Sequence, residues 1–213
     1  GLGDVYKRQH NNLVEIEASD VHQRLGLEKG KYILLSAHRE ENIDTEKNFM
    51  SLFNAINRMA EKYDMPILYS CHPRSRNRLA ASGFKLDPRV IQHEPLGFHD
   101  YNCLQMNAFA VVSDSGTLPE ESSFFTSVGH PFPAICIRTS TERPEAIDKG
   151  DFIIAGIDEK SLLQAVDTAV ELCRDGLHGI PVPDYVDENV STKVIKIIQS
   201  YVGIVNKMVW RKF

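Results

Sequence analysis

The feature of this chain that most constrains its fold is the alternation of short apolar runs with longer segments of helical periodicity. Short apolar runs are typical of buried strands, and apolar residues at helical spacing are typical of amphipathic helices. Because strands alternate with helices throughout, we expect an α/β fold, a Rossmann-like parallel sheet with helices on both faces. The expected strands are residues 32–37, 66–71, 90–92, 110–113, 133–137 and 152–155. The expected helices are residues 12–27, 46–63, 74–81, 100–108, 118–126, 159–175 and 190–210.

The chain divides into four segments. Residues 1–9 match none of the patterns that follow and look like translated adapter or assembly sequence, so we expect them to lie outside the fold. Residues 10–30 form a linker and an entry helix, and residues 31–185 carry the alternating pattern of one domain. Residues 186–213 form a helical segment with more apolar residues than one helix face buries. That excess predicts packing against a further part of a longer protein, with a dimer interface or core packing as the alternative.

Residues 109–121 read as a strand, a sharp turn at Gly116 and the start of a helix. Thr117 and Glu120 have the spacing of a capping box, and Pro119 suits the first turn of a helix. Such an arrangement directs backbone N–H groups and the positive end of the helix dipole to one point, which is a geometry that binds phosphate. An ordinary capped helix after a strand is the alternative.

Polar and charged side chains follow four of the expected strands, at the point where each strand ends. In a parallel sheet the carboxyl ends of the strands share one edge, and ligands bind there. These residues are His38 and Arg39 after the first strand, His72 and Arg74 after the second, residues 114–117 after the fourth and residues 138–144 after the fifth. Individually they could be solvated loop charges or helix caps, but together they predict a site for a phosphorylated sugar or nucleotide.

The residue types at this edge suit a nucleoside diphosphate. Arg138 and the helix N-terminus can hold a diphosphate, because both are strong partners of phosphate oxygens. Glu121 can accept hydrogen bonds from ribose hydroxyls, as acidic residues do in dinucleotide-binding folds. Tyr101 or Phe98 can stack on a base.

Several other classes of protein are disfavoured. The chain has no G-x-G-x-x-G, no P-loop and no G-x-S-x-G motif, so a nicotinamide site, a P-loop ATPase and an α/β-hydrolase are not indicated. A net charge of −5 disfavours nucleic acid, and no apolar run is long enough to span a membrane. The eight histidines lack zinc-site spacing and no C-x-x-C pair occurs, so we expect free buried thiols, no metal and a cytoplasmic protein.

Three motifs carry a resemblance to a known family. Residues 38–42 (HREEN), residues 114–116 (DSG) with Glu120 and Glu121, and residues 138–145 (RTSTERPE) resemble the C-terminal signatures of non-hydrolysing UDP-N-acetylglucosamine 2-epimerases. Further segments resemble the branch that makes UDP-N-acetyl-L-fucosamine for capsular polysaccharide or O-antigen. These segments are residues 70–74, 96–101, 117–119 and 205–213. The resemblance covers everything after the first nine residues.

The resemblance implies the C-terminal, UDP-binding half of a GT-B fold, with the last helix crossing to the N-terminal domain. It also implies roles for individual residues. His38 lies near the reacting sugar and assists catalysis, and Arg39 and His72 match positions that contact a second, regulatory UDP-sugar in some members. The remaining substrate-binding residues are Tyr101 beside the nucleotide, Ser115, Gly116 and Thr117 at the diphosphate, Glu121 at the ribose, Arg138 at a phosphate, and Thr141 and Glu142.

The family reaction eliminates UDP to give a 2,3-unsaturated sugar and then adds it back with C2 inverted. It needs no NAD and no metal. Its acid and base carboxylates belong to the N-terminal domain, so we expect this chain alone to bind UDP weakly and to catalyse nothing. The implied partners are a UDP-N-acetylhexosamine and, for the full-length protein, a second copy in a homodimer. The alternatives are a GT-B UDP-sugar glycosyltransferase and a non-catalytic UDP-sugar-binding domain.

Overall fold

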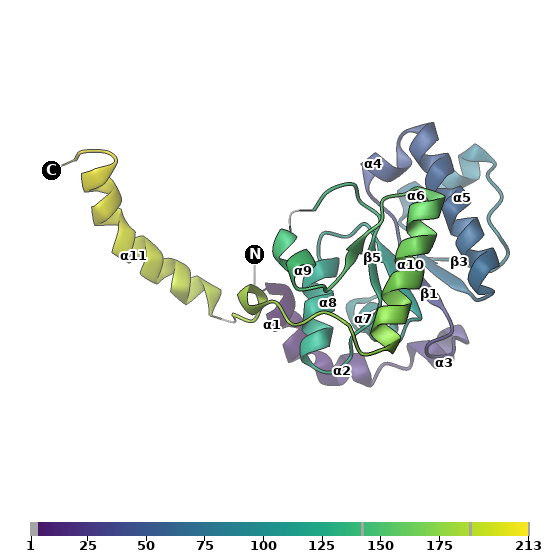
Figure 1. Ribbon diagram of the computed structural model, residues 1–213, viewed down its shortest axis with the longest axis horizontal. Helices are drawn as coiled ribbons and strands as arrows, with labels where there is room; N and C mark the ends of the chain where they lie inside the picture. Colours follow the sequence, from purple (N-terminus) through teal and green to yellow (C-terminus); the bar gives the residue numbers. More distant parts are fainter. Residues whose placement is uncertain (1–3, 142, 188, 213) are drawn as a thin grey trace.

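A six-stranded parallel sheet forms the centre of the molecule, which is seen here in a computed structural model that describes residues 4–141, 143–187 and 189–212 (Figure 1). The strand order is β3-β2-β1-β4-β5-β6, and every neighbouring pair is parallel. This is the strand order of a Rossmann-like sheet, so the expected fold class is confirmed. The strands are β1 Ile33–Ser36, β2 Ile67–Ser70, β3 Val90–His93, β4 Ala110–Ser113, β5 Ala134–Cys136 and β6 Ile153–Ile154.

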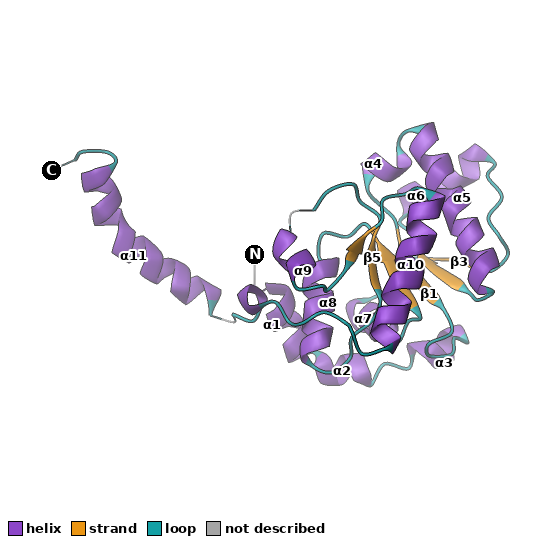
Figure 2. Ribbon diagram, in the orientation of Figure 1, coloured by secondary structure: helices purple, strands orange, loops and turns teal. Residues whose placement is uncertain are grey.

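Helices cover both faces of this sheet (Figure 2). Side chains alternate between the two faces along each strand, so Ile33 and Leu35 join one apolar cluster and Leu34 joins the other. Helices α5 (Glu46–Tyr63), α6 (Pro73–Ser82) and α10 (Glu159–Arg174) contribute to the first cluster. The second cluster includes residues of α2 (Leu13–Glu17), α3 (Val21–Leu25), α7 (Phe98–Met106), α8 (Leu118–Ser127), α9 (Pro144–Asp148) and the 3₁₀ turn η1 (Pro183–Tyr185). A short helix, α4 (Glu40–Ile43), follows β1.

Helices α5 and α10 have the bounds that their periodicity predicts to within one residue. Helix α5 begins where the Thr45 side chain accepts a hydrogen bond from the Asn48 N–H, and α10 begins where Asp158 accepts one from Ser161. The single helix expected over residues 12–27 is wrong, because α2 and α3 are separate. The helical segment is interrupted at Ser19. The Ser19 hydroxyl donates a hydrogen bond to Asp100 on α7 at 2.7 Å and accepts one from the Val21 N–H.

Residues 4–9 are part of the folded domain, contrary to the expectation that residues 1–9 lie outside it. They belong to α1 (Asp4–Asn11), which packs on α7 and α8. The Tyr6 ring meets Phe124 edge-on at 5.2 Å, and the buried Gln9 amide donates to Asn102 at 2.8 Å. Residues 1–3 lie outside the described range.

The last helix, α11 (Val190–Met208), extends away from the domain in Figure 1 and buries none of its side chains. It runs through Gly203 without the interruption that the sequence suggested there. Its exposed apolar residues are Val194, Ile195, Ile197, Ile198, Tyr201, Val202, Ile204 and Met208, followed by Val209 and Trp210. In the part of the chain that the structure describes, no helix has the length and apolar character needed to cross a bilayer.

Candidate functional site

Three buried serines stand side by side where strands β2, β1 and β4 end. Ser36 is in register with Ser70 on one side and with Ser113 on the other. The chain order reverses between β1 and β4, so this row marks the point of the sheet where ligands bind in such folds. In the sequence each of these serines looks like the last residue of an apolar run, so nothing local marks them as part of a site.

A hollow of about 350 Å³ opens above this row of serines. Five predicted site residues line it, which confirms that the topology brings residues from separate loops to one place. The lining consists of Ser36, His38, Arg39, Ser70, Tyr101, Asp114, Ser115 and Gly116.

His38 brings an uncharged imidazole to this hollow. The half-buried ring lies 6.1 Å from the ring of His72, centre to centre, so His72 stands at the rim. Burial lowers the pKa of His38, although the negative charge of Asp114 opposes that shift. Among the described residues, its buried Nδ1 atom has no hydrogen-bond partner. A neutral imidazole at this position can accept a proton at one ring nitrogen or donate a hydrogen bond from the other.

The turn after β4 is held by its own hydroxyl groups. The Ser115 and Thr117 hydroxyls are 2.9 Å apart, and Thr117 donates to the Glu121 carboxylate at 2.8 Å. Gln105 also donates to Glu121, at 2.7 Å, while burial raises the pKa of Glu121. Ser115, Thr117 and Glu121 therefore form one connected group, of which only Ser115 lines the hollow.

The capping box predicted from Thr117 and Glu120 does not form. Thr117 makes no side-chain cap, and Glu120 points instead to Arg143, at 3.3 Å between its Oε1 atom and Nη2 of Arg143. Glu120 is only 5% exposed, so pairing with a cation compensates the cost of its burial better than a cap would. This pair fastens the segment before α9 to helix α8.

The predicted residues after β5 lie farther from the hollow. Arg138 is buried, with its Nε atom 3.4 Å from Glu41, and is not part of the lining. The Thr141 hydroxyl accepts a hydrogen bond from the Arg143 N–H at 2.9 Å. Glu142 lies outside the described residues.

Tyr101 lines the same hollow. Burial raises the pKa of its hydroxyl, and the negative charge of Glu121 raises it further. The Tyr101 hydroxyl therefore stays protonated at neutral pH and can donate a hydrogen bond. Tyr101 shares the lining of the hollow with Ser36 and Ser70.

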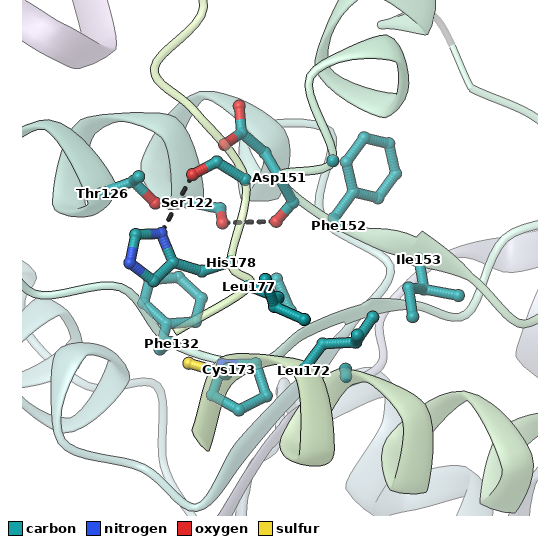
Figure 3. Close-up of a pocket in the computed structure, with 15 residues that line it drawn as sticks. Ser122, Thr126, Phe132, Asp151, Phe152, Ile153, Leu172, Cys173, Leu177 and His178 are labelled. Atoms are coloured by element: carbon teal, nitrogen blue, oxygen red, sulfur yellow. Dashed lines mark hydrogen bonds between the residues drawn. The ribbon is translucent and has the colours of Figure 1, made fainter. Parts of the chain in front are cut away.

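A second, smaller cavity lies at the opposite edge of the sheet, near the amino ends of β5 and β6 (Figure 3). It encloses about 50 Å³ and contains the carboxylate of Asp151, which is 5% exposed. Neither carboxylate oxygen has a hydrogen-bond partner among the described residues, and burial raises the pKa of Asp151 to about 7. Within the described residues, no group of three or more His, Cys, Asp or Glu side chains could hold a metal ion.

The profile of a protein family described as UDP-N-acetylglucosamine 2-epimerase matches residues 3–199. A protein of that name from Methanococcus maripaludis is 34% identical over 64% of this chain and 37% of its own length. The solved structure of UDP-N-acetylglucosamine 2-epimerase from Rickettsia bellii is 33% identical, with a TM-score of 0.76 over 96% of this chain and 53% of that chain.

The structure of the Methanocaldococcus jannaschii UDP-GlcNAc 2-epimerase in complex with UDP-GlcNAc and UDP is 25% identical. Its TM-score is 0.77 over 93% of this chain and 54% of that chain. The chain therefore spans between about a third and about a half of the length of these relatives. From the profile match and the shared fold, this chain belongs to the UDP-N-acetylglucosamine 2-epimerase family.

Proposed function

We propose that this chain is the UDP-binding domain of a UDP-N-acetylhexosamine 2-epimerase. The observation that carries the proposal is the hollow at the switch point of the sheet, where His38, Arg39 and the Ser115–Gly116 turn converge. The family to which the chain belongs includes a protein solved with UDP-GlcNAc and UDP bound, which supports the same ligand class here.

The diphosphate binds at the turn after β4 in this proposal. No described residue accepts a hydrogen bond from the Gly116 N–H, and the Ser115 and Thr117 hydroxyls lie 2.9 Å apart beside it. Helix α8 begins at Leu118, so its positive dipole end points to the same place. Arg138 then approaches a phosphate from the end of β5, and Glu121 accepts hydrogen bonds from the ribose.

Elimination of UDP leaves negative charge on the β-phosphate, and the groups around the turn stabilise that charge. The side chain of Arg39 stands beside the same turn, with its Nη2 atom 3.3 Å from where a β-carbon on Gly116 would lie. His38 faces the sugar and assists proton transfer as a neutral imidazole, while Tyr101 lies beside the nucleotide. The carboxylates that move the C2 proton belong to the N-terminal domain, so this chain alone does not turn over substrate.

The remaining predictions for the whole protein form part of the same proposal. Helix α11 crosses to the N-terminal domain, which would cover the apolar residues that it exposes in this structure. The full-length enzyme is a cytoplasmic homodimer that makes a precursor of capsule or O-antigen in the UDP-N-acetyl-L-fucosamine branch. Arg39 and His72 contact a second UDP-sugar, and Thr141 and Glu142 complete the substrate site.

The experiment is to incubate the full-length protein with UDP-N-acetylhexosamines and follow the reaction by NMR. A C2-inverted UDP-sugar with transient free UDP supports the proposal. Transfer of the sugar to an acceptor identifies a glycosyltransferase, and UDP binding without turnover identifies a non-catalytic domain. Glu121→Gln is the matched variant, because it removes the charge expected at the ribose while keeping a hydrogen-bond acceptor.

A further inference from the structure

One buried carboxylate joins the loops that follow three strands of the sheet. Asp114, the first residue after β4, is 1% exposed. It accepts hydrogen bonds from the backbone N–H groups of His38 at 2.9 Å and Arg39 at 2.8 Å, both in the loop after β1. It also accepts one from the side-chain amide of Asn42 at 3.1 Å.

Asn42 extends this connection to the end of β5. The amide nitrogen that donates to Asp114 also donates to the carbonyl oxygen of Ile137 at 3.1 Å. Ile137 directly precedes Arg138 in the chain. Asn42 is 3% exposed, so both of its hydrogen bonds are shielded from water. The pair Asp114–Asn42 therefore links the loops after β1, β4 and β5.

The side chain of Arg39 is held from the same residue. Its Nε atom donates to the backbone carbonyl oxygen of Asp114 at 3.3 Å, while its backbone N–H donates to the Asp114 carboxylate. Hydrogen bonds between N–H donors and a buried carboxylate are charge-assisted and are stronger than neutral ones. Without the carboxylate, the part-buried backbone N–H groups of His38 and Arg39 lose their acceptor, so the native loop positions become costly.

We propose that Asp114 is a positioning residue that sets the spacing of His38, Arg39 and Arg138 around a bound UDP-sugar. It acts through its backbone and Asn42 contacts, and it does not contact the substrate itself. The inference rests on the proposed function, because it assigns Asp114 the task of holding together the loops that bind UDP. Binding energy depends on such prior organisation, since each loop that must be ordered on binding reduces affinity.

The test compares Asp114→Asn and Asn42→Ala with the full-length wild-type protein. Asp114→Asn keeps the size of the side chain but places an amide donor opposite the donors of His38, Arg39 and Asn42. We expect about tenfold weaker UDP binding by calorimetry, a KM raised by a similar factor, and a reduced kcat. Asn42→Ala breaks only the link to the end of β5, so a smaller loss of about threefold in UDP affinity is expected.

Ser123→Ala is the control for general destabilisation. The Ser123 hydroxyl is buried on α8 and accepts a hydrogen bond from the Val182 N–H at 2.8 Å, away from the hollow. It is expected to lower the melting temperature while leaving UDP affinity and KM unchanged. Hydrogen exchange followed by mass spectrometry gives a second measurement, in which Asp114→Asn speeds exchange of the peptide covering residues 38–42 and Ser123→Ala does not.

These measurements separate the inference from the proposed function. If wild-type protein binds no UDP-sugar, the proposed function fails, and the role of Asp114 in substrate positioning fails with it. If wild-type protein binds UDP but Asp114→Asn binds it as tightly and with the same KM, only the inference is overturned. Unchanged exchange in residues 38–42 of Asp114→Asn also overturns it.

Discussion

The buried carboxylate of Asp151 predicts an unusual pH dependence of stability. Its two oxygens have no hydrogen-bond partner among the described residues, so ionisation places a poorly compensated charge at a cavity of about 50 Å³. Burial raises its pKa from 3.8 to about 7, and a nearby Ser123 hydroxyl offsets part of this effect. Between these two values the folded state keeps a proton that the unfolded state has released.

The protonated Asp151 carboxyl therefore makes its full contribution to the free energy of unfolding below about pH 4. This contribution decreases as the pH rises and is lost above about pH 7. At 1.36 kcal/mol for each pKa unit, the full effect is about 4 kcal/mol, and relaxation around the charge reduces it to about 2 kcal/mol. Replacing Asp151 with Asn removes the titration, although the amide is also buried without a partner. The variant should therefore lose the pH dependence even if its stability falls at every pH.

The assay is urea unfolding of the wild type and of Asp151→Asn, followed by circular dichroism at about pH 5 and about pH 8. The assay covers about two of the three pKa units over which this stabilisation is lost. The unfolding free energy of the wild type should therefore fall relative to that of Asp151→Asn by about 1 kcal/mol from the lower to the higher pH. Asp148→Asn is the control, since that carboxylate is 76% exposed. A wild type and Asp151→Asn that change in parallel with pH would refute the argument.

Three further substitutions or deletions test other parts of the structure. Gly116→Ala places a β-carbon 3.3 Å from Nη2 of Arg39, so calorimetry should show UDP binding weakened about fivefold. Gly97→Ala is its control, because a β-carbon there meets no atom within 4 Å and should leave UDP binding unchanged. Gln9→Ala removes a buried hydrogen bond to Asn102 and should cost about 1–2 kcal/mol in urea unfolding, while the exposed Asn11→Ala should cost nothing measurable. Deleting residues 190–213 from the 213-residue chain should leave its melting temperature unchanged, because α11 buries no side chain here. The deletion should also reduce self-association measured by light scattering, because it removes exposed apolar residues. A large fall in melting temperature would show that α11 packs on the domain.

Much of the fold could be predicted because its signals are local. The apolar stripe of α5 and the capping residue Thr45 lie within the same segment, so both bounds of this helix follow from adjacent residues. The buried run of β4 and the glycine after it likewise locate the loop that contributes Ser115 and Gly116 to the hollow. Parallel pairing then brings the loop of His38 and Arg39 to the same edge.

The features that were missed depend on contacts between distant segments. The spacing of Thr117 and Glu120 predicts a capping box, but Glu120 pairs with Arg143, which is 23 residues later in the chain. Nothing in the local sequence shows that Arg143 lies close enough to compete with the cap. Asp114 looks like an ordinary polar residue after a strand, because its partners His38 and Arg39 lie 75 residues or more earlier in the chain. Residues 1–9 resemble adapter sequence and match no later pattern, so the packing of α1 on the domain, through Tyr6 and Gln9, cannot be read from their own composition.

The central claim is that the hollow at the ends of β1 and β4 binds UDP. Its most direct test is a titration of the isotope-labelled 213-residue chain with UDP, followed through the backbone amide signals in NMR. We expect the largest shifts at Ser115, Gly116 and Thr117, with smaller shifts at His38 and Arg39. Shifts that instead cluster around Asp151, or no shifts at millimolar UDP, would contradict it.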